Sequence, residues 1–281
     1  MKVACTVDQI ESLRPRDIKV ILDGDKKSEF LLLDVRQPEE YKAGHIPGAM
    51  LIPLGELEAR HGELDRDKRI IAYCRSGHRS TAAAIALCRL GFKGVHRLDG
   101  GIVNWPYETI RGMPKPIPES ISEAADIKDI LILAIGLEKG SWDFYMAAKN
   151  KVQLPKAVWI FQMLADIEES HMQRLYQHAV GLLGEKVVLF LENLKAELRA
   201  EHMEGQIEIN FALAKVDEKL EGEIEALEMA IEKEYVSYDF YKRTSALVVS
   251  QDAQTLLHEL SLDERNHANI LLKQLERVVG Q

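Results

Sequence analysis

The first part of the chain alternates short apolar runs with amphipathic stretches. The runs FLLLDV (30–35) and RIIAYC (69–74) are short and almost wholly apolar, which is typical of parallel strands that are buried on both faces. The stretch STAAAIALCRLG (80–91) has helical spacing and ends at a glycine. Strands that alternate with helices in this way predict an α/β domain with a parallel sheet.

The pattern changes after about residue 120, where strand signals nearly disappear. Apolar positions recur with helical spacing from about 121 to 279, with breaks near 150–155, 181–184 and 250–252. These breaks separate long amphipathic segments that need one another to bury their apolar faces. The pattern predicts an all-α helix bundle.

Glycine and proline mark the boundary between the two patterns. Residues 1–116 hold 11 of the 18 glycines and seven of the nine prolines. The run GMPKPIPES (112–120) contains three prolines and should be extended and stiff. We therefore predict one domain at 1–112, a proline-rich linker at 113–120 and a second domain at 121–281.

Charge and composition narrow the functional classes. Residues 1–116 carry 19 Lys and Arg against 16 Asp and Glu, whereas residues 117–281 carry 17 against 29. The acidic second half argues against nucleic acid as a partner. We expect no membrane partner, because no run approaches 18 consecutive apolar residues. A cytoplasmic location is expected from the missing secretory leader and the sparse cysteines; we interpret Cys5 and Cys88 as ordinary buried residues.

The third cysteine lies in a different setting. The stretch YCRSGHRS (73–80) follows a predicted strand and opens a predicted helix, where backbone N–H groups can point toward an anion. Arg75 and Arg79 add positive charge nearby. These features lower the pKa of a thiol, and they predict that Cys74 is a nucleophilic thiolate.

Residues 4–106 resemble a single-domain rhodanese. The resemblance is carried by LLDVRQPEEYKAGHIPGAMLIPL (32–54), IIAYCRSGHRS (70–80), LGFKGVHRLDGG (90–101) and NWP (104–106). It implies that Cys74 accepts a sulfane sulfur as a persulfide and passes it to a thiol acceptor. The six-residue loop matches sulfur-transferring members, whereas related phosphatases have one residue more. The implied catalytic loop consists of Cys74, Arg75, Ser76, Gly77, His78 and Arg79.

The second half contains an internal repeat with an offset of 96 residues. Glu168 and His171 in DIEESHMQRL (166–175) correspond to Glu264 and His267 in LDERNHANIL (262–271). At the same offset, AIGLEKGSWDFY (134–145) corresponds to AIEKEYVSYDFY (230–241). One Glu-x-x-His pair alone would more often be a solvated helix face. Two copies in register predict a duplicated helix pair.

Each repeat thus offers a glutamate on one helix and Glu-x-x-His on the next. In a four-helix bundle these groups meet in the core, and this is the di-metal carboxylate pattern. Four carboxylates and two imidazoles suit two iron ions, with manganese as the alternative. The predicted ligands are Glu138, Glu168, His171, Glu234, Glu264 and His267.

Residues 120–280 resemble the ferritin-like rubrerythrin group, which implies the same six ligands. In that family tyrosines placed as Tyr145 and Tyr241 donate to ligand carboxylates, although an aromatic core role is the alternative. The family has a further glutamate three residues after the third-helix ligand. Here that position is Ser237, and its repeat mate is Ser141, so we expect a more symmetric site. No rubredoxin-like cysteine pair is present. Glu201 and Glu204, in the crossover at 185–211, could approach the site, but their spacing does not require this.

Together these features predict sulfur transfer through a Cys74 persulfide in one chain with a di-iron site. That site would reduce peroxide, or oxidise ferrous iron with oxygen or peroxide. The expected partners are small sulfur donors, thiol acceptors, peroxide or oxygen, an unidentified electron donor and a second copy in a homodimer. The alternatives are a metal-binding sensor of sulfur or redox state, and a helical assembly module without turnover at the metal.

Overall fold

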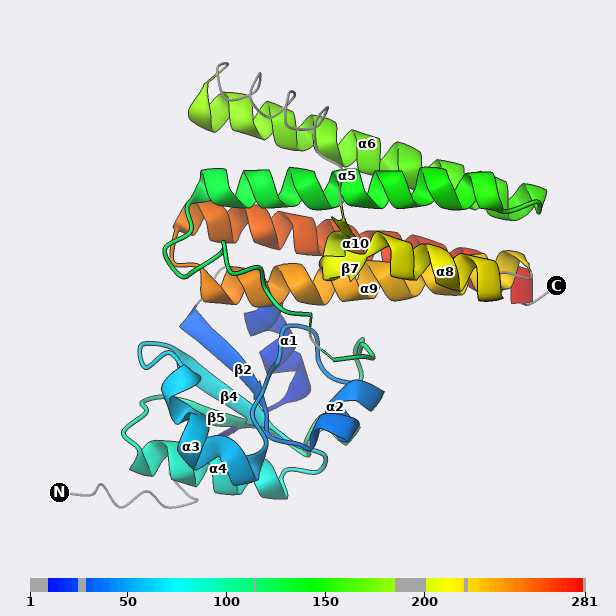
Figure 1. Ribbon diagram of the computed structural model, residues 1–281. Coiled ribbons are helices and arrows are strands. Elements are labelled where there is room, and N and C mark those ends of the chain that lie inside the picture. The colour runs from blue at the N-terminus through cyan, green and yellow to red at the C-terminus, as the bar shows by residue number, and fades with distance from the viewer. Residues whose placement is uncertain (1–9, 25–28, 114, 185–200, 220–221, 280–281) are drawn as a thin grey trace. The chain divides into compact units, whose positions relative to one another are not determined.

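The computed structural model describes residues 10–24, 29–113, 115–184, 201–219 and 222–279. The chain divides after Met113 into two compact units (Figure 1). The first unit is α/β and the second is almost wholly helical, so both predicted fold classes are confirmed. None of the helices in these ranges combines the length and the apolar character that a membrane span requires.

The N-terminal unit is built around a five-stranded sheet in the order β1-β5-β4-β2-β3. All four strand pairs are parallel. The predicted strands at 30–35 and 69–74 form the neighbouring central strands β2 and β4, with Asp34 opposite Tyr73. The strands are β1 (Glu11–Leu13), β2 (Phe30–Asp34), β3 (Met50–Leu51), β4 (Arg69–Tyr73) and β5 (Val95–Leu98).

Helices cover both faces of this sheet because successive strand residues point to opposite sides. Leu33 and Ile70 pack in one cluster with Leu87 of the last helix, whereas Leu32 and Ile71 pack on the other face. The central strands are therefore buried on both sides, which explains why their sequences are continuous apolar runs. The helices are α1 (Pro15–Asp23), α2 (Pro38–Ala43), α3 (Leu57–Arg60) and α4 (His78–Arg89).

Within the described part of the C-terminal unit there are four long helices. Helix α5 packs against α6, and α9 packs against α10 (Figure 1). The breaks between them fall at 152–154 and 248–250, close to two of the predicted breaks. Asp126 caps α5, because its carboxylate accepts hydrogen bonds from two backbone N–H groups of the first turn. The helices are α5 (Ile127–Lys151), α6 (Pro155–Leu183), α9 (Glu223–Leu247) and α10 (Gln251–Val279).

The connection between the two helix pairs contains a short hairpin that the helical spacing did not predict. Strands β6 (His202–Met203) and β7 (Ile207–Glu208) pair antiparallel, and the 3₁₀ turn η6 (Glu204–Gln206) joins them. Helix α8 (Ile209–Lys219) follows directly. Most of the predicted crossover, 185–200, lies outside the described residues.

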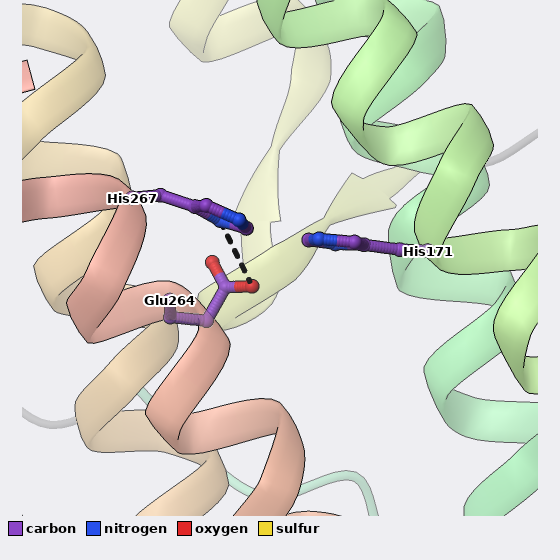
Figure 2. A group of neighbouring side chains, drawn as sticks. All are labelled: His171, Glu264 and His267. Carbon is purple, nitrogen blue, oxygen red and sulfur yellow. Dashed lines mark ion pairs between the residues drawn. The ribbon is translucent and has the colours of Figure 1, made fainter. Parts of the chain in front are cut away.

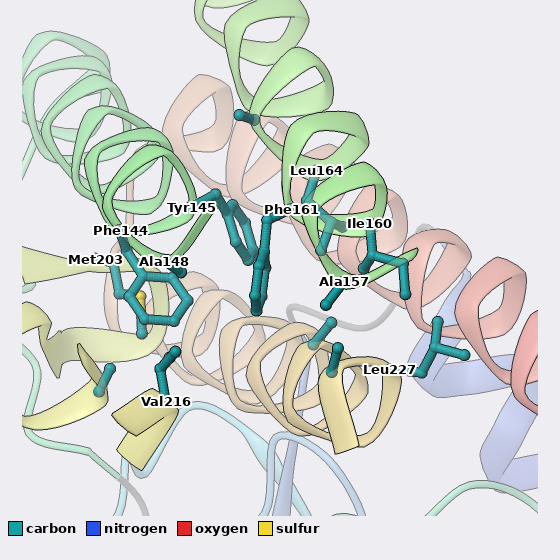
Figure 3. Packing of buried hydrophobic residues seen from close by; sticks show 14 of the residues in the cluster. Phe144, Tyr145, Ala148, Ala157, Ile160, Phe161, Leu164, Met203, Val216 and Leu227 are labelled. Atoms are coloured by element: carbon teal, nitrogen blue, oxygen red, sulfur yellow. The ribbon is translucent and has the colours of Figure 1, made fainter. Parts of the chain in front are cut away.

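Two apolar clusters fill the bundle at different heights along its length. One contains Phe144, Tyr145 and Phe161 (Figure 3), and the other contains Ile135 and Leu257. On each long helix the cluster residues fall on both sides of one predicted ligand glutamate along the sequence. The sequence thus places the polar centre of the bundle between two layers that exclude water.

Candidate functional site

Cys74 lies in the loop between β4 and α4, and 1% of it is exposed. The Gly77 backbone N–H donates to its Sγ at 3.1 Å. The thiol donates to Ser80 Oγ at 3.6 Å, and that hydroxyl in turn donates to the Gly77 carbonyl oxygen. The sulfur is therefore held by the loop and by the first turn of α4.

Two glycines allow the loop to take this shape. Gly77 has a φ of 101°, in the left-handed region that other residues rarely adopt. Gly101 has a φ of 68°, and a Cβ there would lie 2.5 Å from the Arg75 carbonyl oxygen. This close approach lets the Ile102 N–H donate to the Cys74 carbonyl oxygen at 2.8 Å. The second loop thus fixes the backbone that carries the cysteine.

The surroundings of Cys74 lower the pKa of its thiol. Burial acts to raise this pKa, but hydrogen bonds from Ser80, Gly77 and Ser76 outweigh burial because they stabilise the thiolate. The backbone contributions agree with the predicted nest of N–H groups. The thiolate is the form of Cys74 that can act as a nucleophile in sulfur transfer or oxidation.

The predicted arginines act less directly than their position in the sequence indicated. Arg79 forms two hydrogen bonds with Glu40, at 2.6 and 2.8 Å, which lower the pKa of that carboxyl to about 2. Much of its charge is therefore offset locally. Arg75, Ser76 and His78 are exposed at the rim, where the Ser76 hydroxyl lies 3.2 Å from His78 Nδ1.

The state of a second cysteine differs from its interpretation in the sequence. Among the described residues Cys74 is the free cysteine, whereas Cys88 on α4 is disulfide-bonded. The interpretation of Cys88 as an ordinary buried thiol was therefore wrong. Cys5 lies outside the described residues.

The bundle brings the six predicted ligand residues together between its two apolar clusters. The four glutamates are at most 2% exposed, and one ligand residue comes from α5, one from α9 and two each from α6 and α10. His171 is buried, while 15% of the His267 side chain is exposed. Three mutually close groups within this region could each hold a metal ion: His171, Glu264 and His267; Glu138, Glu168 and His171; and Glu138, Glu204 and Glu264.

The two repeats form the same local arrangement. His171 Nδ1 lies 3.1 Å from Glu138 Oε2 and 3.6 Å from its own repeat's Glu168. In the second repeat, His267 Nδ1 lies 3.4 Å from Glu234 Oε2 and 3.9 Å from Glu264 Oε1. The two imidazole rings face each other, with their centroids 4.7 Å apart, above Glu264 (Figure 2).

Several buried carboxylate oxygens in this centre have no hydrogen-bond partner. They are Glu138 Oε1, Glu168 Oε2, Glu234 Oε2 and both oxygens of Glu264. Burying a carboxylate without a hydrogen-bond partner is costly. Burial is the main cause that raises the pKa of both Glu138 and Glu264, and the negative charge of Glu204 is the second. Cations would satisfy these oxygens, so the residues present fit a pair of divalent metal ions.

The two tyrosines that were predicted to donate to ligands behave differently from each other. Tyr145 donates to Glu234 Oε1 at 3.2 Å, across from the first repeat to the second. Tyr241 donates to Glu204 Oε1 at 2.9 Å, a carboxylate outside the six predicted ligands. Both rings are fully buried, so each also serves the apolar core that was the alternative interpretation.

Sequence reasoning missed Lys233 and left Glu201 and Glu204 open. Glu201 is exposed, whereas Glu204 is buried in the bundle. The Lys233 ammonium lies 2.7 Å from Glu168 and 2.6 Å from Glu204, and it is buried beside the predicted ligands. Its repeat mate is Leu137, and Glu204 lies in the crossover, outside both repeats. The expectation of a more symmetric site was therefore wrong, because a charged pair occupies one side only.

The fold and these donors define a four-helix carboxylate–histidine metal protein joined to an α/β domain with a cradled cysteine. Rubrerythrin matches residues 129–276, and the rhodanese-like domain matches residues 16–108. The chain therefore belongs to the rubrerythrin family and carries a rhodanese-like domain ahead of its helices. Family membership implies a di-iron site in the bundle.

Individual relatives share about a third of the chain. A sulfurtransferase of Allochromatium vinosum is 37% identical over 91 residues, which cover 32% of this chain and 82% of the relative. An HTH-type transcriptional regulator of Mycobacterium tuberculosis is 45% identical over 87 residues, covering 31% of this chain and 37% of the relative. A putative sulfur carrier protein of Bacillus subtilis is 42% identical over 85 residues, covering 30% of this chain and 46% of the relative.

The chain therefore spans less than half the length of these last two relatives. Among solved structures, a rhodanese-related protein from Thermoplasma volcanium has 31% identity and a TM-score of 0.33. The aligned region covers 36% of this chain and 97% of the chain of that protein.

Proposed function

We propose that this protein is a two-centre redox enzyme. Cys74 carries sulfane sulfur, and the bundle binds two iron ions that reduce peroxide or, in the same site, are oxidised by oxygen. The observation that carries the proposal is the set of buried carboxylate oxygens without a hydrogen-bond partner that lie around His171 and His267. A site of this kind has no structural need for so many desolvated acids unless cations complete it.

The sulfur step uses groups that this chain supplies. The Cys74 thiolate attacks the outer sulfur of a donor such as thiosulfate; a new S–S bond forms, and sulfite leaves with the electron pair of the broken bond. The Gly77 N–H and the Ser80 hydroxyl lie around the sulfur and stabilise its negative charge. A thiolate acceptor then attacks the outer sulfur and releases the Cys74 thiolate.

In the bundle, the residues of this chain would bind the metal ions and keep the ligand carboxylates oriented. The six predicted ligands would hold the metals, and a bound pair of ferrous ions would supply the two electrons that peroxide reduction to two waters needs, together with two protons. The apolar clusters on both sides exclude bulk water from the centre. Tyr145 keeps Glu234 oriented through the hydrogen bond at 3.2 Å.

The fusion motivates a link between the two centres, because no built-in electron donor was found in the sequence. Two thiols convert the Cys74 persulfide into thiol, a disulfide and hydrogen sulfide. Hydrosulfide and a thiol together could release two electrons and one proton as their new S–S bond forms a hydropersulfide, and bound ferric ions would be the acceptor of those electrons. A sulfur donor with excess thiol would thus sustain peroxide reduction.

The first experiment is metal analysis of the purified protein, followed by stopped-flow absorbance after peroxide is added to anaerobic, ferrous-loaded protein. The proposal expects two irons per chain and a rapid ferric absorbance, both lost in Glu168→Ala and His267→Ala. A chain that binds metal without this response would instead support a metal-binding sensor. A chain without metal would support a sulfurtransferase with a helical assembly module.

A second experiment tests the link alone. Peroxide consumption is followed with thiosulfate and a thiol as the sole reductants, in the wild type and in Cys74→Ser. Equal rates would contradict the link while leaving the di-iron proposal intact. Light scattering on the same samples tests the proposed homodimer.

A further inference from the structure

The turn η6 carries one more carboxylate into the centre. Gly140 on α5 lets the hairpin approach, because a Cβ there would overlap the His202 carbonyl oxygen and lie 2.9 Å from Met203 Cα. On the other side Gly205 has a φ of 68°, and a Cβ there would lie 2.6 Å from Val236 Cγ1 on α9. The segment is thus wedged between α5 and α9. The wedge leaves Glu204 fully buried in the bundle.

The Glu204 carboxylate is placed among the predicted ligands. It belongs to a group with Glu138 and Glu264 whose ligand atoms all lie within 4.8 Å of one another. Glu264 has two buried oxygens without a hydrogen-bond partner, and Glu138 has one. Unpaired, desolvated oxygens beside a third carboxylate point to a shared cation rather than to a hydrogen-bonded acid cluster.

Contacts with the two helices fix Glu204 in this position. Tyr241 donates to one oxygen at 2.9 Å, and Ser141 donates to the other at 3.1 Å. The Ser141 hydroxyl also accepts the Glu204 backbone N–H at 3.2 Å. Ser141 is the repeat mate of Ser237, the position where the sequence lacks the family's further glutamate. The crossover therefore brings a carboxylate to a position where the helices have serine.

Lys233 supplies the matching positive charge. Its ammonium lies 2.6 Å from Glu204, 2.7 Å from Glu168 and 3.5 Å from Glu234, and 3% of its side chain is exposed. Five carboxylates and one ammonium leave four negative charges, which two divalent ions neutralise. Without Lys233 the fifth carboxylate would leave the loaded centre with excess negative charge in a desolvated site.

We propose that Glu204 is a fifth carboxylate ligand of the metal centre and that Lys233 is the resident cation that balances it. The inference rests on the proposed metal-binding function and names two further residues of that site. It accounts for the lysine beside the ligands, for the glycines that admit the turn, and for the hydrogen bonds of Ser141 to Glu204. Glu204 replaces a ligand from the helices with one from the crossover.

The test is anaerobic titration of the full-length protein with Co²⁺, followed by visible ligand-field absorbance and by calorimetry. The wild type should bind two ions per chain. Glu204→Gln should weaken at least one ion tenfold, which corresponds to about 1.4 kcal/mol, and should change the spectrum. Glu208→Gln, exposed on the neighbouring strand β7, is the matched control and should match the wild type.

A double variant separates ligation from charge. Glu204→Gln with Lys233→Met keeps the same net charge as the wild type, so a spectrum that still differs reports a lost ligand. If the double variant regains the wild-type spectrum and affinities, Glu204 acts only through its charge, and the ligation proposal fails. Lys233→Met alone should raise the affinity, because it removes a like charge; a lower affinity would overturn the balancing role.

The remaining outcomes are also decisive. If Glu204→Gln does not fold by circular dichroism, Glu204→Asp withdraws the carboxylate by one methylene and should change the cobalt spectrum; an unchanged spectrum overturns the proposal. Two cobalt ions bound with wild-type parameters in Glu204→Gln would sink the ligand assignment while the proposed metal function stands. A wild type that binds no cobalt would overturn both.

Discussion

The cysteine loop and the metal centre hold negative charge with different parts of the chain. Around Cys74 the stabilising groups are mostly backbone N–H donors of one loop and one helix start, supported by glycines at positions with positive φ. In the bundle they are side chains from four helices and one crossover turn, buried between apolar layers. A short contiguous motif can encode the first kind of site, whereas the second depends on residues spread over more than 120 positions.

The largest effect is expected from a substitution that removes the sulfur nucleophile and leaves the bundle unchanged. Cys74→Ser should reduce sulfur transfer from thiosulfate to cyanide on the order of a thousandfold or more, because a serine hydroxyl is not ionised near neutral pH. Iron content per chain, measured on the same sample, should equal the wild-type value. Loss of iron in this variant would show that the two centres are not independent in structure.

Metal removal should weaken the bundle and leave the cysteine site unchanged. Ions that bind only the folded bundle stabilise it by about 2.7 kcal/mol each when free metal is a hundredfold above the dissociation constant. Chelation should therefore lower the melting temperature of the bundle transition in calorimetry and leave thiosulfate sulfurtransferase activity at ambient temperature unchanged. An unshifted bundle transition would contradict metal binding at the folded centre.

Two glycines on α5 test whether the turn η6 is held as tightly as described. Gly140→Ala should destabilise the bundle by about 3 kcal/mol, because its Cβ would overlap the hairpin backbone. Gly136→Ala is the matched control; a Cβ there meets nothing within 4 Å, and it should stabilise the helix by about 0.5–1 kcal/mol. Urea unfolding monitored by helical circular dichroism measures both. Equal effects would contradict the close approach.

The smallest effect concerns the ion pair beside the cysteine loop. The Arg79 guanidinium holds the pKa of Glu40 at about 2, so this carboxylate stabilises the fold above its ordinary pKa and the benefit disappears as the pH falls toward 2. Both side chains are about a third exposed. Glu40→Gln should therefore cost less than about 1 kcal/mol at pH 7 and almost nothing at pH 2. A pH-independent cost in urea unfolding would show that packing, not charge, is lost.

Periodicity and repetition were sufficient to predict both folds and to name residues that the structure brings together. The buried strands follow from continuous apolar runs, and an offset of 96 residues identifies Glu168 and Glu264 as equivalent positions. Repetition could not find Glu204, because it lies outside both copies of the repeat. Lys233 was hidden for the opposite reason: it lies inside a repeat, but its mate is an apolar residue.

A local signal for these two residues does exist in retrospect. Lys233 lies four residues before Ser237, so both occupy the helix face where a carboxylate of the family is missing. The sequence MEG (203–205) places a glycine directly after Glu204, as a tight turn into a core requires. Neither signal identifies a partner by itself, because both depend on a crossover whose path the helical spacing does not specify.

The single lysine in the centre has a consequence for the ancestry of the bundle. A homodimer of the first helix pair would have four carboxylates and no lysine, and a homodimer of the second pair would have four carboxylates and two lysines. Neither half could build a centre with one ammonium and five acids. Such a centre requires two halves of different sequence within one chain. A homodimer of either helix pair would therefore be symmetric but would lack this combination of one lysine and five carboxylates.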